Sequence, residues 1–242
     1  MRVEFLGYPV DNLDKHEFIN YVQNSILSGS KNVIAVQNAN KMYLSNKYTK
    51  MKDYFKISDI ILPENAINIG MHILGSSLVE RNMGGVNMMA ELLLLCNKYS
   101  YSVYFLGSTK YELMCLIDAV RLKYSNVKIL GYHDGYFTGS EEQNIIDEIK
   151  ENRPNILFIG LGSPKQEYFI LEYLKILPVN IIMGVGGSFK VIGGLDKPAP
   201  RWTKYGFEWL YRSIQEPKKF KRYITVNTFF IKELVSKGLM KI

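Results

Sequence analysis

The chain has 242 residues, of which 47% are apolar and 22% charged, as is ordinary for a folded globular protein. That length suits one large domain or two small ones with a sizeable core. No window of about 20 residues is uninterruptedly apolar, and the N-terminus lacks the layout of a signal peptide, so we expect no transmembrane helix and a cytoplasmic protein.

The positive charge is concentrated at the C-terminus. The whole chain carries a formal net charge of +7, and residues 201–242 contain ten Lys or Arg against three Glu, a net of 10 − 3 = +7. Residues 1–200 therefore sum to 7 − 7 = 0. A basic tail of this kind predicts an anionic partner: a phosphate group, a nucleic acid or a membrane surface.

The cysteines and histidines do not indicate a metal or disulfide protein. Cys96 and Cys115 lie in apolar, helix-like stretches and are expected to be buried free thiols. The three histidines are scattered without metal-ligand spacing. We therefore expect no metal and no cofactor.

In chain order, the first elements are a strand at 3–6, a helix at 15–28 capped by Asp14, and a buried strand at 32–36. Polar amides follow that strand, and a helix begins at about Lys41. Because open α/β sheets bind ligands at the carboxyl ends of their strands, Asn38 is a candidate ligand-binding residue. The alternative is that Asn38 or Asn40 only caps the next helix.

The next strand, at 58–62, ends in Pro63-Glu64-Asn65 before a helix to Leu74. A carboxylate in that position makes Glu64 a candidate general base, and the alternative is charge complementarity with the helix N-terminus. Arg81 lies in the loop before a helix that ends at about Tyr99. It is either a clamp for an anionic substrate or a solvated surface residue.

Strand–helix units of regular length fill the second half of the chain. Strands are expected at 102–106, 127–132 and 180–185, and a helix at 110–123. A second helix is expected to begin with a capping box at Ser140 and to end at residue 152. This alternation predicts a parallel sheet with helices on both faces. Gly107 and Gly160 both end strands, so their loops are expected to line one edge of that sheet.

The most informative stretch is 156–167, in which a buried strand runs into Gly160-Leu-Gly162-Ser-Pro-Lys-Gln-Glu167. The glycines permit a sharp turn, and Ser163 as N-cap with Pro164 after it predicts a helix whose N-terminus could bind an anion. Lys165 adds a charge. The alternative is a turn that binds nothing. A nicotinamide cofactor is not expected, because the third Gly and the acid of the Rossmann fingerprint are missing.

The expected fold is α/β: a Rossmann-like parallel sheet with helices on both faces, plus a basic-aromatic helical C-terminal appendage. We assign residues 1–195 to the α/β domain and residues 196–242 to the appendage. Lysines, arginines and aromatic residues interleave in the appendage, which suits a membrane interface. Nucleic-acid binding, and a helix docked on the domain with a solvated basic face, are the alternatives.

Several separated motifs together resemble the WecG/TagA/CpsF family of bacterial glycosyltransferases, over residues 33–222. The most specific is the Gly-x-Gly-x-Pro-Lys-Gln-Glu run at 160–167. It is followed by Gly-Val-Gly-Gly-Ser-Phe at 184–189, Pro-Ala-Pro at 198–200 and Gly-Phe-Glu-Trp-Leu-Tyr-Arg at 206–212. Upstream, Glu-Arg-Asn-Met-Gly at 80–84 and Gly-Tyr-His-Asp-Gly-Tyr-Phe at 131–137 resemble further family elements.

The resemblance implies an inverting, metal-independent transfer of a sugar, N-acetylmannosamine or a related hexose, from a UDP donor. The implied acceptor is a polyprenyl-diphosphate-linked sugar at the inner face of the cell membrane. The implied pathways build wall teichoic acid and other surface polysaccharides. The implied partners are these two substrates and an anionic membrane surface, with a homo-oligomer possible and no nucleic acid. The sequence agrees with metal independence, since it has no Asp-x-Asp motif.

The resemblance also implies roles for particular residues. Glu64 occupies the place of the family's catalytic aspartate, one methylene longer, and Arg81 matches its functional arginine. The implied donor-binding residues are Asn38, Gly107, Ser108, Gly135, Gly160, Gly162, Pro164, Lys165, Gln166, Glu167 and Gly186. The implied acceptor- or diphosphate-binding residues are Arg212, Lys219 and Arg222.

Two other interpretations of the sequence remain open. The chain could bind a UDP-sugar without catalysis, because Glu replaces Asp and Val36 stands where the family has Thr. It could instead bind nucleic acid through its tail, which would leave the polar strand ends without a use.

Overall fold

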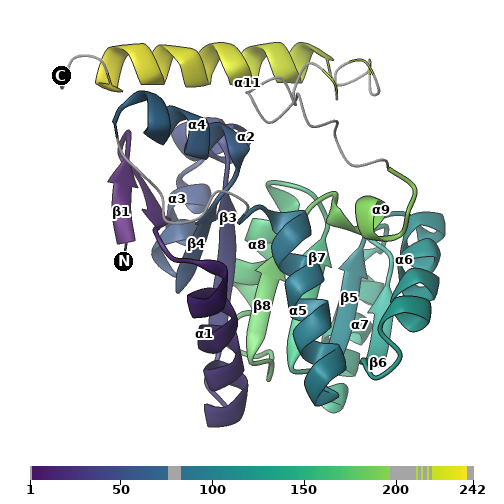
Figure 1. Cartoon of the computed structure of the whole chain (residues 1–242). Helices are drawn as coiled ribbons and strands as arrows, with labels where there is room; N and C mark the ends of the chain where they lie inside the picture. The colour runs from purple at the N-terminus through teal and green to yellow at the C-terminus, as the bar shows by residue number, and fades with distance from the viewer. Residues whose placement is uncertain are drawn as a thin grey trace.

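The computed structural model describes residues 2–75, 83–196, 211, 214, 217 and 220–238. Its centre is a six-stranded sheet in the order β4-β3-β8-β7-β5-β6, and every pairing within it is parallel. This confirms the α/β fold with a Rossmann-like sheet (Figure 1). The strands are β3 (Asn32–Gln37), β4 (Ile60–Pro63), β5 (Ser102–Gly107), β6 (Lys128–His133), β7 (Ile156–Gly160) and β8 (Ile181–Gly184).

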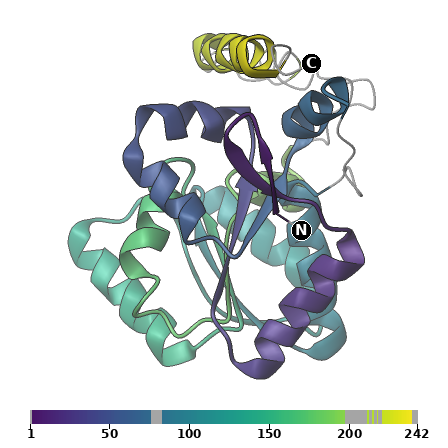
Figure 2. The ribbon, with the colours of Figure 1, turned by 90° about the vertical axis from the view of Figure 1, so that its left-hand side faces the viewer.

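Helices cover both faces of the sheet (Figure 2), so every strand except the edge strand β6 is a short, nearly continuous apolar run. One face packs against α1, α5, α6 and α9, and the other against α3, α7 and α8. The helices of the first face are α1 (Lys15–Ser28), α5 (Gly85–Tyr99), α6 (Lys110–Lys123) and α9 (Ser188–Ile192). Those of the second are α3 (Thr49–Lys56), α7 (Gly139–Asn152) and α8 (Lys165–Tyr173).

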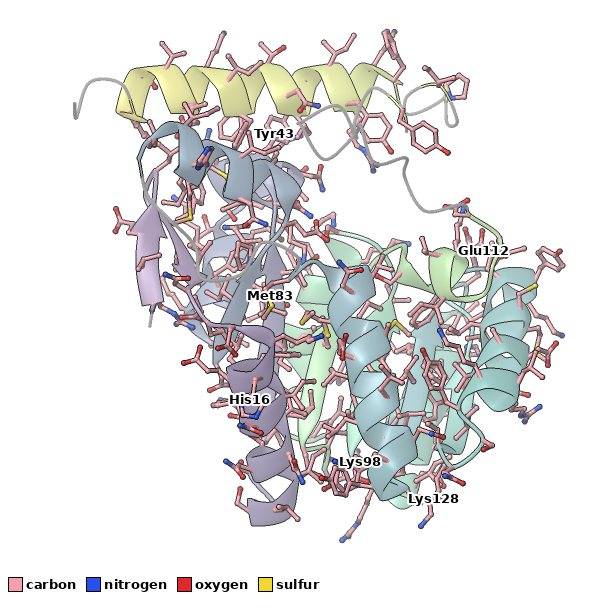
Figure 3. The ribbon with its side chains drawn as sticks, in the orientation of Figure 1. His16, Tyr43, Met83, Lys98, Glu112 and Lys128 are labelled. Carbon is pink, nitrogen blue, oxygen red and sulfur yellow. The ribbon has the colours of Figure 1, made fainter. Side chains whose placement is uncertain are left out.

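A third apolar cluster lies at the carboxyl end of the sheet and attaches the C-terminal helix. It joins α2 (Ala39–Lys47), α4 (Asn65–Ile73) and α11 (Phe220–Glu233) to an N-terminal hairpin, and a π-helical turn, Leu234–Gly238, continues α11. Figure 1 shows α11 lying across α2 and α4. The ring of Tyr43, which is labelled in Figure 3, contacts Phe229 with 5.6 Å between centroids, and Phe5 lies 6.2 Å from Phe230.

The N-terminal hairpin was only half predicted. Strand β1 (Arg2–Phe5) pairs antiparallel with β2 (Tyr8–Asp11), an element that the sequence pattern did not indicate. Leu6 and Gly7 make the connection with φ of 54° and 84°, as a two-residue turn with both residues in the left-handed region requires. Asp11 then accepts from Arg2 and from the backbone N–H of Ile61, so the hairpin is fixed to β4.

Helix caps decide which of the expected boundaries hold. Asp14 caps α1, as expected, and forms a capping box with Glu17, whereas the cap of α6 by Thr109 had not been predicted. The start of α7 was placed too late: Thr138, not Ser140, forms the capping box, with Glu141. Thr138 and Ser140 are each followed three residues later by an acid or an amide. The cap at Thr138 lies earlier in the chain and gives the longer helix.

The two thiols are free, as expected, although Cys115 is only partly buried. Among the described residues, no helix is long and apolar enough to cross a membrane.

Candidate functional site

A cavity of about 330 Å³ opens at the carboxyl ends of β3, β4 and β8, where ligands bind in open α/β sheets. The two turns that follow β7 and β8 and the first residues of α11 complete its wall. The polar and charged side chains in this wall belong to Asn38, Asn40, Lys41, Glu64, Ser163, Gln166, Ser188, Lys190, Asp196, Arg222 and Tyr223.

Glu64 projects into this wall with its carboxylate held from two sides. Its Oε2 accepts from Asn38 Nδ2 at 2.7 Å, and its Oε1 accepts from the backbone N–H of Gly85 at 3.2 Å. Although Glu64 occupies the N-cap of α4, its side chain makes no capping hydrogen bond there. The carboxylate therefore does more than complement its own helix, and an ionised carboxylate has about four acceptor sites, so room remains for a substrate proton.

The N-terminus of α5 reaches Glu64 because glycines stand there. A Cβ on Gly84 would lie 3.3 Å from Glu64 Cγ, and one on Gly85 would lie 3.6 Å from Oε1. The α5 helix is 15 residues long, and its first N–H groups have no partner within the helix. The Gly84-Gly85 pair thus lets the positive end of a helix dipole approach the carboxylate.

Asn38 performs both of the roles that the sequence left open. Its Oδ1 accepts from the backbone N–H of Lys41 at 2.9 Å and so caps α2. Its Nδ2 donates to Glu64. The strand end after β3 is thereby coupled to the strand end after β4.

Gln166 connects the turn after β7 to the turn after β8. Its Oε1 accepts from the backbone N–H of Gly186 at 3.1 Å, and its amide nitrogen packs where a Cβ on Gly184 would stand, 2.7 Å away. Gln166 and Gly186 both line the cavity, together with Asn38 among the predicted donor residues.

The start of α8 differs from the predicted one. Pro164, not Ser163, is the N-cap, and no side chain caps the helix. The Ser163 hydroxyl instead donates to Glu167 at 2.9 Å. A tertiary contact with a buried carboxylate has replaced the local cap.

The other predicted donor residues in the sheet lie beside the cavity and do not line it. Gly107 pairs with Gly160, and a Cβ on Gly107 would come within 2.4 Å of the Gly160 backbone. Ser108 donates its N–H to Gly160 and accepts from the N–H of Gly135. These four residues form a tightly packed backbone cluster at the ends of β5 and β7, which confirms that the two loops share one edge of the sheet.

The remaining predicted residues have varied positions. Glu167 is fully buried behind the wall. Gly162, Pro164 and Lys165 also lie outside the lining, and Lys165 is exposed. Arg222 lines the cavity from the first turn of α11, with its guanidinium over the ring of Tyr223. Arg81, Arg212 and Lys219 lie outside the described residues.

Two lysines of the wall were not predicted. Lys41 pairs with Glu167 at 3.0 Å, and Lys190 pairs with Glu112 at 2.9 Å; Glu112 is labelled in Figure 3. Burial alone would raise the pKa of Glu112, but hydrogen bonds from Lys190 and from the backbone N–H of Thr109 lower it below its usual range. Lys41 could have been predicted as a site residue from its position, because it is a cation in the first turn of the helix that follows the polar end of β3.

The described residues contain no group of three or more His, Cys, Asp or Glu side chains placed to hold a metal ion.

Comparisons with known proteins identify the family. The model of the glycosyl transferase WecG/TagA/CpsF family matches residues 3–241, a longer range than the motifs alone covered. A relative from Bacillus subtilis (strain 168) is 29% identical over 222 residues, which cover 90% of this chain and 85% of the relative. A relative from Staphylococcus aureus (strain MW2) is 27% identical over 245 residues, which cover 99% and 95%.

Both relatives carry the name N-acetylglucosaminyldiphosphoundecaprenol N-acetyl-beta-D-mannosaminyltransferase. With a family model that spans nearly its whole length, the chain belongs to the WecG/TagA/CpsF family and is a glycosyltransferase.

Proposed function

We propose that the protein transfers N-acetylmannosamine, or a related hexose, from a UDP donor to N-acetylglucosaminyldiphosphoundecaprenol. The names of the relatives support the sugar and the acceptor. The observation that carries the proposal is the Glu64 carboxylate, which lies at a polar cavity and is oriented by Asn38 and the N-terminus of α5. The product would enter the synthesis of wall teichoic acid or another surface polysaccharide.

In the proposed reaction Glu64 is the general base. It takes the proton of the acceptor hydroxyl while that oxygen bonds to the anomeric carbon of the donor. The bond from the anomeric carbon to the β-phosphate oxygen breaks on the opposite side, and UDP leaves. A single in-line displacement of this kind inverts the anomeric configuration.

The leaving diphosphate gains negative charge as that bond breaks, so the site must supply donors and cations. Arg222 reaches the cavity and makes no ion pair with the residues that the structure describes. Arg81, Arg212 and Lys219 remain predicted to act with it. The sequence has no Asp-x-Asp motif, which supports transfer without a metal ion.

The C-terminal appendage, residues 196–242, is proposed to hold the enzyme on the inner face of the cell membrane. One side of α11 packs on the domain through Val226 and Phe230. The opposite side exposes an apolar stripe flanked by Lys221 and Lys232. The stripe consists of Phe220, Ile224 and Ile231 on α11 and Val235 in the π-helical turn after it, which are 44–58% exposed. A helix with apolar residues and flanking lysines on its outer side suits an anionic bilayer surface.

The test is turnover of UDP-N-acetylmannosamine with a short-chain prenyl-diphosphate-linked N-acetylglucosamine, followed by UDP release and by mass spectrometry of the lipid product. We expect a disaccharide-lipid product with inverted anomeric configuration and equal rates with and without EDTA. UDP-sugar binding with no product would refute transferase activity and favour a UDP-sugar-binding protein. Loss of turnover in EDTA would refute the metal-free mechanism alone.

A further inference from the structure

Glu167 organises one wall of the cavity from behind. A single oxygen, Oε1, accepts from Lys41 Nζ at 3.0 Å, from Ser163 Oγ at 2.9 Å and from Gln166 Nε2 at 2.9 Å. All three donors line the cavity, whereas Glu167 is fully buried and does not. The other oxygen, Oε2, has no hydrogen-bond partner among the described residues. The carboxylate is therefore directed at the three cavity side chains.

Lys41 is held as a nearly buried cation at the cavity surface. Its side chain is 5% exposed, and its ammonium also lies 5.8 Å from the centre of the Tyr54 ring. An ammonium has three N–H donors, and the contact with Glu167 uses one of them. A buried charge is retained at such a position only with a partner, so the pair acts as one unit. What Lys41 offers a ligand is a fixed hydrogen-bond donor.

The charge balance indicates which part of a donor substrate this unit suits. Glu167 compensates the charge of Lys41, so the pair is neutral overall. A diphosphate requires net positive charge, and Arg222 enters the same cavity without an ion pair to any described residue. A sugar hydroxyl or acetamido oxygen is neutral and requires a well-placed donor, which the compensated ammonium provides.

The position of Lys41 in the fold agrees with this division. Its backbone N–H bonds to Asn38 Oδ1, and the amide nitrogen of the same Asn38 side chain bonds to Glu64. Lys41 is therefore one helical turn from the residue that orients the proposed base. The base must lie at the acceptor hydroxyl, which attacks the anomeric carbon of the transferred sugar, so Lys41 belongs to the sugar side of the site.

We propose that Lys41 determines sugar specificity by donating a hydrogen bond to a hydroxyl or acetamido oxygen of the transferred sugar, and that Glu167 is the positioning residue that fixes it. The inference rests on the proposed function, because it requires a UDP-sugar donor. It assigns Lys41 a substrate contact and gives Glu167 a role that needs no contact with the donor.

The test compares UDP with UDP-N-acetylmannosamine in the double variant Lys41→Met, Glu167→Gln. The double variant removes both charges together and keeps both side chains close to their original size, so no buried charge is left unpaired. Loss of one hydrogen bond from a charged donor should weaken UDP-N-acetylmannosamine binding by about tenfold or more, while the Kd for UDP stays within about twofold. Calorimetry measures both constants, and the donor KM should rise in parallel.

Asp147→Asn, Lys150→Met is the matched control, because it removes an exposed lysine–carboxylate pair on α7, away from the cavity. Both ligands should bind this control as they bind the wild type. Equal weakening of UDP and UDP-N-acetylmannosamine in the cavity variant would place Lys41 on the diphosphate and overturn the proposal. Unchanged binding of both ligands would also overturn it.

Positioning by Glu167 has its own readout in Glu167→Gln alone. This variant should raise the KM for UDP-N-acetylmannosamine by about tenfold with kcat within about threefold, since it disturbs sugar binding and leaves Glu64 in place. Parallel losses of kcat and UDP affinity would show a merely structural role and refute the assignment. If the wild type binds UDP but turns over no UDP-sugar, the proposed function fails. If the wild type is active but the variants bind UDP and UDP-N-acetylmannosamine with the same relative affinity as the wild type, this inference alone fails.

Discussion

Glu64→Gln is the sharpest test of the proposed chemistry, because the structure defines what the change does. Asn38 Nδ2 and the Gly85 N–H both donate to the carboxylate, at 2.7 and 3.2 Å. A glutamine side chain can accept one of these bonds, but its NH₂ group then faces the other donor. The mismatch at this partly buried position should lower the free energy of unfolding by about 1–3 kcal/mol.

The effect on catalysis should be much larger than the effect on stability. Without a base, kcat should fall by about 10²–10⁴-fold, while the Kd for UDP should change little because Glu64 is assigned to the sugar side. The assay is UDP release with the lipid-linked acceptor, with UDP binding measured in parallel. Glu64→Asp is the matched control, since it keeps a carboxylate, and it should retain more activity than Glu64→Gln. Near-normal turnover in Glu64→Gln would refute Glu64 as the base.

Three further outcomes are expected. Replacing Ile224 and Ile231 with serine should weaken co-sedimentation with anionic vesicles by about tenfold or more without a change in Tm, since both side chains are exposed; unchanged sedimentation would contradict membrane docking through this stripe. Because the pKa of Glu112 is lowered, its pair with Lys190 should stabilise the fold above pH 4.5, the ordinary pKa of Glu, and this stabilisation should be lost as the pH falls through the lowered pKa. In thermal melts, the Tm of Glu112→Gln should therefore fall less in acid than the Tm of the wild type. Identical dependence of the two Tm values on pH would contradict this. Burial raises the pKa of Cys96 to about 12, so a disulfide reagent near pH 8 should label Cys115 in the native protein and Cys96 only after unfolding; equal labelling rates would contradict the burial.

Much of the fold was predictable because the local signals agree with the tertiary structure. Each strand of the main sheet except the edge strand β6 is a short apolar run, and Asp14 as a cap indicated the start of α1. The failures fall where two local solutions compete. Thr138 and Ser140 each begin a plausible capping box, and Ser163 is a good cap until the buried Glu167 takes its hydroxyl.

The site was predictable only in part, because its geometry depends on strand order. Glu64 and Asn38 could be found as polar residues at strand ends. Their hydrogen bond follows from the pairing of β3 with β4, and their proximity to Gln166 and Gly186 follows from the insertion of β8 between β3 and β7. The sequence pattern does not specify that insertion. The partner of Lys41 lies on α8, far along the chain, so no local pattern could have indicated the pair.

The distribution of charge in the cavity explains why the site needs three separate parts of the chain. Glu64 must stay available to a substrate proton, and neutral donors, an amide and a helix N–H, orient it without an ion pair to any residue that the structure describes. Lys41 and Lys190 are each compensated by a carboxylate outside the lining, so neither supplies net charge to the cavity. The positive charge that a leaving diphosphate requires must come from elsewhere, and among the described residues that line the cavity we propose Arg222 on α11 as its source. Because Val226 and Phe230 anchor that helix to the domain, packing of α11 would, on this proposal, also complete the diphosphate side of the site.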